Sequence, residues 1–176
     1  MTFAVRWARR ALIVAACAFA APSVLAQTPQ QREICYRTSA ADDQTIGGCT
    51  AVIQSGKESQ DNQAIAYYNR GIGYQNRKDY ELALKDYDQA LRLRPNHAEM
   101  LDSRAFTELK LNLYDAAITD YNDVLKLKPN KEESLYGRGL AKRASGDKAG
   151  GDADIEAALK IRSDVPKDFE KWGVSP

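Results

Sequence analysis

The sequence contains very few of the side chains that catalytic and metal sites need. It has one histidine, His97, and three cysteines without a C-x-x-C pair. Metal sites and acid–base catalysts depend mainly on histidine, cysteine and clustered carboxylates. His97 follows Pro95 and Asn96 in what reads as an exposed turn, with no serine or cysteine placed to share a hydrogen bond. We therefore expect no enzyme activity, no metal site and no cofactor.

The chain also lacks an excess of charge of one sign. Lys and Arg total 25 and Asp and Glu total 24, so the formal net charge is +1. A nucleic-acid partner requires a basic surface that neutralises phosphates, and we expect no such partner. The length of 176 residues, with 44% hydrophobic residues, four phenylalanines and two tryptophans, is typical of one modest globular domain.

A long apolar run is present only near the N-terminus. Residues 1–26 contain three arginines and no acid, and residues 11–21 are all apolar. This pattern is typical of a secretory signal peptide, and the run is too short for a bilayer, which needs about 20 residues. We expect cleavage near Ala26, no membrane span, and a bacterial protein that is periplasmic or secreted. A lipoprotein with Cys17 as its first residue is the less favoured alternative, because only a short apolar stretch separates Arg10 from Cys17.

Removal of residues 1–26 changes both the charge and the cysteine count. It takes away three of the 25 basic side chains and none of the 24 acidic ones, so the net charge becomes −2. Two cysteines remain, Cys35 and Cys49, in a compartment that is expected to be oxidising. An even number of cysteines there indicates a disulfide. A structural bond is favoured over a redox-active pair, because neither C-x-x-C spacing nor a flanking cation is present.

The sequence matches itself at one constant interval, which is the separation of Pro95 from Pro129. The matching residues are Tyr80, Ala83, Tyr87, Leu91 and Pro95 with Tyr114, Ala117, Tyr121, Leu125 and Pro129. Within each copy the apolar residues are three and four apart, which is the period of an α-helix. A second amphipathic segment precedes each of these helices, after a polar turn. One helix pair cannot bury both of its apolar faces, so the pairs are predicted to stack as an all-α solenoid.

These residues resemble the tetratricopeptide repeat family, whose units are about 34 residues long, as is the interval found here. The motifs are Tyr67-x-x-Arg70-Gly71-x-x-Tyr74, Ala83-x-x-x-Tyr87-x-x-Ala90 and Pro95. The resemblance implies helix-turn-helix repeats in a right-handed superhelix, with a concave face built from the first helix of each pair. It divides the chain into repeats at residues 64–97, 98–131 and 132–165. The last is expected to be a divergent cap, because Gly150 and Gly151 interrupt its second helix.

The segments on either side of these repeats are less regular. Ile46, Cys49, Val52 and Ile53 keep the core spacing of a second helix, but Ile46 precedes Leu84 by slightly more than the repeat interval. Residues 27–63 are therefore predicted to be a divergent first repeat and linker, in which a Cys35–Cys49 bond staples the two helices. Closing about 15 residues in this way is worth roughly 3 kcal/mol. Residues 166–176 form a tail whose Phe169 and Trp172 are expected to cover the last helix pair or to occupy the groove.

Arginine and aspartate also recur at the repeat interval. The two series are Arg70, Arg104 and Arg138, and Asp86, Asp120 and Asp154. The resemblance implies that the arginine position is usually apolar, so these arginines need partners. A half-buried guanidinium matches a carboxylate, and we predict a structural ladder of ion pairs between first and second helices. A row of cations for an anionic ligand is disfavoured, because the aspartates are equal in number.

The resemblance places an apolar stripe on the concave face. Its members, which are the predicted partner-binding residues, are Tyr68, Ile72, Phe106, Leu109, Tyr136 and Leu140. Such a stripe suits a peptide or helix guest, although the same residues could simply pack against their neighbours or against the tail. A clamp for a C-terminal carboxylate is rejected, because Glu99, Asp102 and Glu133 share this face.

Together these features predict a non-catalytic periplasmic scaffold that binds a protein or peptide partner in its groove. Two alternatives stay open. The chain could be a self-associating structural protein of the cell envelope, which would make it a homo-oligomer. It could also be the regulatory subunit of an envelope enzyme. The fold does not identify the partner, because function lies in the site.

Overall fold

The computed structural model describes residues 28–37 and 40–174. The predicted signal peptide and Cys17 lie outside these residues. The described part of the chain consists of nine helices without a strand. They are α1 (Pro29–Tyr36), α2 (Asp42–Ser55), α3 (Gln60–Asn76), α4 (Tyr80–Leu93), α5 (Ala98–Lys110), α6 (Tyr114–Leu127), α7 (Glu132–Ser145), α8 (Lys148–Ile161) and α9 (Val165–Lys171).

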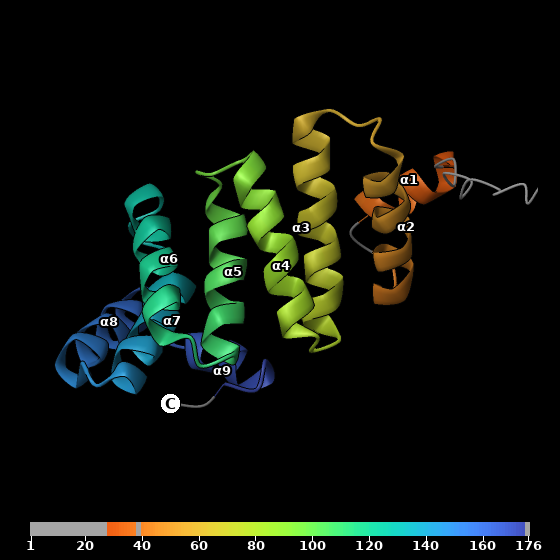
Figure 1. Ribbon diagram of the computed structural model, residues 1–176. Coiled ribbons are helices and arrows are strands. Elements are labelled where there is room, and N and C mark those ends of the chain that lie inside the picture. Colours follow the sequence, from red (N-terminus) through yellow and green to blue (C-terminus); the bar gives the residue numbers. More distant parts are fainter. Residues whose placement is uncertain (1–27, 38–39, 175–176) are drawn as a thin grey trace, which may run out of the picture.

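The first eight helices form four consecutive pairs, and each pair packs on the next (Figure 1). The order is α1/α2, α3/α4, α5/α6 and α7/α8, and α9 follows as a short separate helix. The prediction of an all-α solenoid of stacked helix pairs is therefore confirmed. In Figure 1 α9 lies by the lower end of α5, away from the line of the stack.

The turns within the pairs repeat with the sequence. Lys78 and Asn112 adopt left-handed backbone angles, with φ of 66° and 60°, and Gly146 takes the same place in the next pair with φ of 104°. Glycine is the residue that adopts this conformation at least cost. The backbone conformation of Lys78 and Asn112 therefore has a higher energetic cost than that of Gly146.

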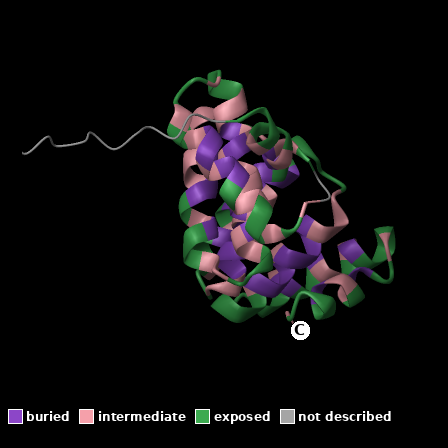
Figure 2. Cartoon of the chain, turned by 90° about the vertical axis from the view of Figure 1, so that its right-hand side faces the viewer, coloured by how far each residue is buried: buried purple, intermediate pink, exposed green. Residues whose placement is uncertain are grey.

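The core lies between the two helices of each pair and between neighbouring pairs (Figure 2). Tyr87 and Tyr121, which occupy the same position in successive repeats, are 0% and 1% exposed. Tyr87 packs directly on the backbone of Gly71, where an added Cβ would lie 2.6 Å from Cε1 of the tyrosine ring. A small residue is required at Gly71 for α3 and α4 to approach this closely.

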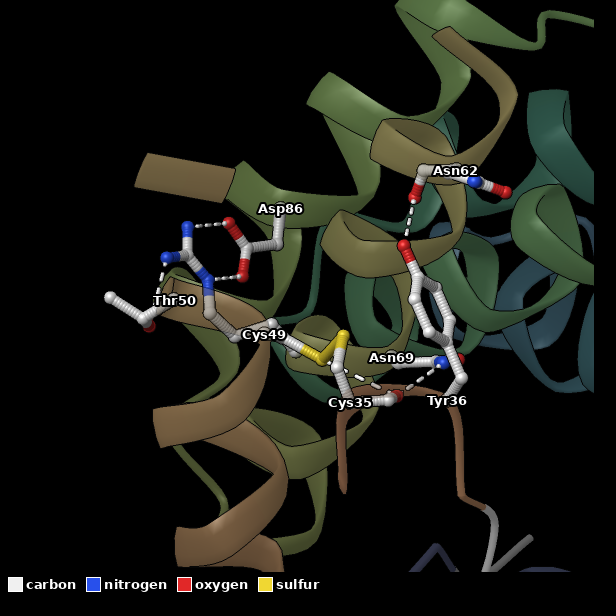
Figure 3. Close-up of a disulfide and its surroundings, with 8 residues drawn as sticks. Cys35, Tyr36, Cys49, Thr50, Asn62, Asn69 and Asp86 are labelled. Atoms are coloured by element: carbon white, nitrogen blue, oxygen red, sulfur yellow. Dashed lines mark hydrogen bonds and ion pairs between the residues drawn. A yellow bond between two sulfur atoms is a disulfide. The ribbon is translucent and has the colours of Figure 1, made fainter. Parts of the chain in front are cut away.

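A disulfide joins Cys35 of α1 to Cys49 of α2, as expected (Figure 3). Both cysteines are fully buried. The pair is also tied to α3, because the side-chain amide of Asn69 donates to the carbonyl oxygen of Cys35 at 2.8 Å and Tyr36 donates to the carbonyl of Asn62 at 3.2 Å. The disulfide therefore anchors a helix of only eight residues to the rest of the solenoid.

Reducing this disulfide, or replacing Cys35 and Cys49 with serine, is expected to lower the free energy of unfolding by about 3 kcal/mol, because the unfolded chain regains the entropy of the open loop. The loss should be confined at first to α1 and α2, since end repeats contact one neighbour only. Hydrogen exchange of oxidised and reduced protein measures this directly. Equal protection of α1 in both states would contradict the prediction.

Candidate functional site

Each of the three periodic arginines lies on the first helix of a pair and forms two hydrogen bonds with an aspartate on the second helix of the same pair. Nε and Nη2 of Arg70 donate to the two carboxylate oxygens of Asp86 at 2.7 and 2.8 Å. Arg104 holds Asp120 in the same way at 2.6 and 2.9 Å. Arg138 holds Asp154 at 2.7 and 2.6 Å. This two-bond geometry is the strongest form of a guanidinium–carboxylate pair.

Each arginine also makes a third bond, which reaches back to the preceding pair. Nη1 donates from Arg70 to Thr50 at 3.1 Å, from Arg104 to Asp88 at 2.8 Å and from Arg138 to Asn122 at 2.8 Å. Asp88 and Asn122 are separated by the repeat interval, whereas Thr50 precedes Asp88 by the longer interval that separates Ile46 from Leu84. These acceptors were not predicted from the sequence, although their spacing reproduces the longer interval between the first pair and the second.

The consequence is that the arginine ladder connects neighbouring repeats as well as the helices inside them. The arginine side chains are between 18% and 23% exposed, and their aspartates between 6% and 11%. All three guanidinium groups are hydrogen-bonded to other side chains of the same chain. The ladder is structural in this conformation, and its guanidinium groups are not free to bind an anionic ligand.

A buried glutamate beside the ladder was not predicted. Glu108 on α5 is 7% exposed, and its Oε2 has no hydrogen-bond partner among the residues that the structure describes. Its other oxygen lies 4.0 Å from Nε of Arg104, which already holds Asp120. Burial, together with the nearby charge of Asp120, raises the pKa of the Glu108 carboxyl to about 8. The repeat pattern does not predict Glu108, because the equivalent positions of the neighbouring repeats hold Tyr74 and Lys142.

The predicted partner-binding residues do not form one open stripe. Tyr68, Ile72 and Phe106 are half-buried. In contrast, Leu109, Tyr136 and Leu140 are 7%, 2% and 6% exposed and belong to one hydrophobic core cluster. Part of the assignment therefore needs correction, because these three side chains are covered by the chain itself.

The covering element is the C-terminal tail. Phe169 of α9 is 1% exposed and its ring centroid lies 4.8 Å from that of Tyr136 and 6.0 Å from that of Phe106. Trp172 follows α9 and packs edge-on against Phe106, with ring centroids 5.4 Å apart. The tail therefore lies on the inner face of the solenoid, over the first helices of the last two pairs.

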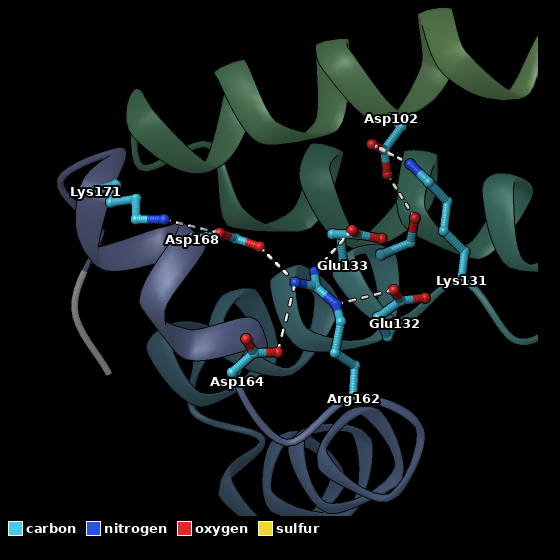
Figure 4. A network of polar contacts seen from close by, with 9 residues as sticks. Asp102, Lys131, Glu132, Glu133, Arg162, Asp164, Asp168 and Lys171 are labelled. Atoms are coloured by element: carbon cyan, nitrogen blue, oxygen red, sulfur yellow. Dashed lines mark hydrogen bonds and ion pairs between the residues drawn. The ribbon is translucent and has the colours of Figure 1, made fainter.

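Polar contacts fix the tail in this place (Figure 4). Arg162, just before α9, donates to Glu132 and Glu133 at the start of α7 at 3.0 and 2.7 Å, and to Asp168 in α9 at 2.6 Å. At the other end of the tail, Nζ of Lys110 donates to the carbonyl oxygens of residues 172 and 173, both at 2.9 Å. The tail is thus held at both of its ends.

A pocket of about 340 Å³ remains between the tail and the first helices, and we call it the aromatic pocket. Phe106, Phe169 and Trp172 supply its apolar wall. The lining residues are Gln75, Asn76, Asp102, Ser103, Phe106, Tyr121, Lys131, Glu133, Phe169 and Trp172. Its charged residues are already paired, because Lys131 and Ser134 contact Asp102 and Arg162 contacts Glu133. Ile72 and Leu140 lie outside this pocket, in two other hollows of the same structure.

The described residues show no feature of a metal or membrane site. Nowhere among them do three or more His, Cys, Asp or Glu side chains come together in a way that could hold a metal ion. No described helix has the length and apolar character needed to cross a membrane. His97 precedes α5 and is half-buried rather than exposed, with Nδ1 3.2 Å from a carboxylate oxygen of Glu99.

Comparison with known families agrees with the repeat geometry. The tetratricopeptide repeat family matches residues 64–97, which carry most of α3 and all of α4, and again residues 98–131, which carry α5 and α6. Residues 64–131 are therefore two tetratricopeptide repeats. The two matched repeats contribute Gln75, Asp102, Ser103 and Phe106 to the aromatic pocket, so its wall is built largely from tetratricopeptide first helices.

Solved structures show the same fold over most of the chain. MamA 41-end from Desulfovibrio magneticus RS-1 superposes with a TM-score of 0.68 and 21% identity over 84% of each chain. A double mutant of MamA RS-1 gives 0.67 and 21% over the same shares. A further MamA structure gives a TM-score of 0.61 and 18% identity, with 77% of this chain and 69% of that chain covered. No curated protein sequence matches the chain.

Proposed function

We propose that this tetratricopeptide repeat protein is a non-catalytic scaffold that binds a peptide or a helix of a partner protein on its inner face. The aromatic pocket carries the proposal. It is concave, it has an apolar wall of three aromatic rings, and amide and hydroxyl groups surround that wall. Sites of this kind bind an apolar anchor and orient it with a few polar contacts.

The exposure of Trp172 supports this assignment. Trp172 is 48% exposed although its ring contacts both Phe106 and Phe169. An aromatic side chain that is packed on one face and open on the other offers contact area to a partner at little cost in side-chain entropy. The ladder arginines and the buried leucines of the inner face take no part in this binding.

We also propose that the protein acts in an exported compartment, the bacterial periplasm or the outside of the cell. The support is the arginine-bearing apolar segment that precedes Ala26, together with the Cys35–Cys49 disulfide. Disulfides persist in oxidising compartments and are rare in the cytosol.

Replacing Trp172 with alanine is expected to weaken partner binding about thirtyfold, which is the loss that an aromatic anchor typically causes. The matched control is Leu127→Ala, since Leu127 on α6 is also 48% exposed but does not line the pocket. Crosslinking and affinity capture from envelope extracts, followed by affinity measurement with the captured partner, would test this. Capture of the same partners at the same strength by the Trp172 variant would overturn the pocket as the binding site.

A further inference from the structure

We propose that the groove contains an anion subsite, which makes the partner peptide one that carries acidic side chains next to a bulky apolar side chain. This inference rests on the proposed function and specifies the chemistry of its ligand. The subsite is a hollow of about 450 Å³ adjoining the aromatic pocket, with which it shares Gln75, Asn76, Phe106 and Trp172. We call it the lysine hollow.

Three lysines from three separate segments line this hollow. Lys78 comes from the turn after α3, Lys110 from the end of α5, and Lys171 from the end of α9. Tyr80 and Gly173 complete its lining, which includes no carboxylate among the described residues. Because residues so far apart in the sequence supply the ammonium groups, the hollow exists only when the tail lies on the inner face.

Two of the three ammonium groups in the hollow, those of Lys78 and Lys110, have no carboxylate partner within the described part of the chain. No carboxylate lies within ion-pair distance of Lys78 or Lys110 there. Lys110 instead donates to the two backbone carbonyls of the tail, and the desolvation of its ammonium group, with the nearby charge of Lys78, lowers its pKa. Lys171 is 3.6 Å from Asp168, whose other oxygen is held by Arg162. An incoming anion would relieve the repulsion between these cations.

A side-chain amide adds hydrogen-bond donors to the same wall. The oxygen Oε1 of Gln75 accepts from the hydroxyl of Tyr87 at 2.9 Å. The hydroxyl of Thr107 lies 3.0 Å from the same oxygen and shares its one proton between Gln75 and the carbonyl oxygen of Ser103, which is 2.8 Å away. The buried Tyr87 hydroxyl therefore fixes the amide, and the NH₂ group of Gln75 makes no bond to another described residue. Ammonium groups and an amide NH₂ group are donors that suit a carboxylate.

The aromatic pocket, at the other end of the groove, is lined by acidic side chains. Asp102 and Glu133 line the aromatic pocket, and their charges are matched by Lys131 and Arg162. A peptide whose apolar side chain sits against Phe106 and Trp172 would place a neighbouring acidic side chain in the lysine hollow. A basic side chain at the same position would be repelled. A peptide with glutamate or aspartate beside its anchor is therefore the ligand that fits.

Lys78 offers a test that does not threaten the fold. Its φ of 66° is a conformation that favours glycine. The substitution Lys78→Gly therefore removes an ammonium group and also lowers the conformational strain of the backbone. Asn112→Gly is the matched control, because Asn112 has φ of 60° one repeat later and does not line the lysine hollow. Thermal unfolding should show both variants to be at least as stable as the unmodified chain.

The experiment is a selection of binders from a random-peptide display library, made in parallel on the unmodified chain and on both variants. Peptides selected on the unmodified chain and on Asn112→Gly should be enriched in an aromatic or aliphatic residue beside acidic ones. The acidic enrichment should disappear on Lys78→Gly. The affinity of a synthetic selected peptide should fall about tenfold in Lys78→Gly and again in Lys171→Gln, as expected for the loss of a charge-assisted hydrogen bond.

The outcomes separate the subsite from the groove. If the selected peptides lack acidic enrichment, or if Lys78→Gly binds the acidic peptide as tightly as the unmodified chain does, the anion subsite is overturned and the groove remains. In that case Lys78 and Lys110 only complement the C-terminal ends of α3 and α5. If no peptide is selected on the unmodified chain, the proposed function itself is overturned. An amide analogue of the selected peptide should bind about tenfold more weakly and should be insensitive to Lys78→Gly.

Discussion

Replacing Arg104 with alanine is expected to lower the free energy of unfolding by about 3–5 kcal/mol, because the change leaves buried charge without compensation. Asp120, 5% exposed, would lose both bonds of its fork, and Asp88 would lose the bond that ties it to the next repeat. Equilibrium denaturation with urea measures the loss.

The position of Arg104 also predicts how the variant unfolds. In a solenoid each repeat is stabilised mainly by its neighbours, and Arg104 connects the α3/α4 pair to the α5/α6 pair. We expect hydrogen exchange to show that the segment from α1 to α4 and the segment from α5 to α9 lose their cooperativity with each other.

The control for Arg104 is Arg77→Ala. Arg77 is 49% exposed on its side chain and pairs with Asp43, which is 80% exposed. Exposed pairs of this kind contribute little, so the change should cost less than about 1 kcal/mol. A loss for Arg104→Ala as small as that for Arg77→Ala would show that the ladder does not stabilise the stack.

Replacing Glu108 with glutamine is expected to make the protein more stable at neutral and mildly alkaline pH. Burial raises the pKa of Glu108 from its ordinary value of 4.5 to about 8 in the folded chain. The folded state therefore retains this proton more tightly than the unfolded state. The associated stability is fully present below pH 4.5 and is lost as the pH rises toward 8.

Glutamine has a similar shape and carries no charge at any pH, so the variant should not show this loss. The difference in unfolding free energy should grow steadily across that pH window and reach about 2–4 kcal/mol at its upper end, since one pKa unit corresponds to about 1.4 kcal/mol. Urea denaturation at a series of pH values gives the curve. Parallel pH profiles for the variant and the unmodified chain would contradict a raised pKa.

Glu156→Gln is the matched control, with the opposite expected sign. Glu156 is exposed on α8, and its hydrogen bond with Lys160 lowers its pKa. Its contribution to stability is therefore present at neutral pH and is lost as the pH falls through its folded-state pKa. The glutamine variant at this position should be no more stable than the unmodified chain near neutral pH.

The period of the sequence was sufficient to predict the architecture. Tyr80, Ala83 and Tyr87 recur with the spacing of a helix face, and a repeated pattern has to be satisfied by repeated structure. Helix pairs in contact with their neighbours are the arrangement that buries such a pattern. The same period predicted Arg70 opposite Asp86, because residues in constant register on two packed helices face each other in every repeat.

The candidate binding site could not be predicted in the same way from the period of the sequence. The tail occurs once, so no second copy shows where it packs. Its Phe169 and Trp172 could have covered the end of the stack, but they lie on the inner face, where they bury Tyr136 and form the aromatic pocket with Phe106. The predicted apolar stripe was divided by this contact, and only the part that lines the aromatic pocket remains a candidate binding surface.

By itself, the sequence determined the repeat, the helix pairs, the registered arginine–aspartate series and the two cysteines of the first pair. These features follow from the spacing of residues along the chain, which the sequence gives directly. Only the tertiary structure decided the burial of Glu108, the third bond of each arginine, the path of the tail and the meeting of Lys78, Lys110 and Lys171. Each of these depends on side chains from segments that share no register, and only packing brings such segments together.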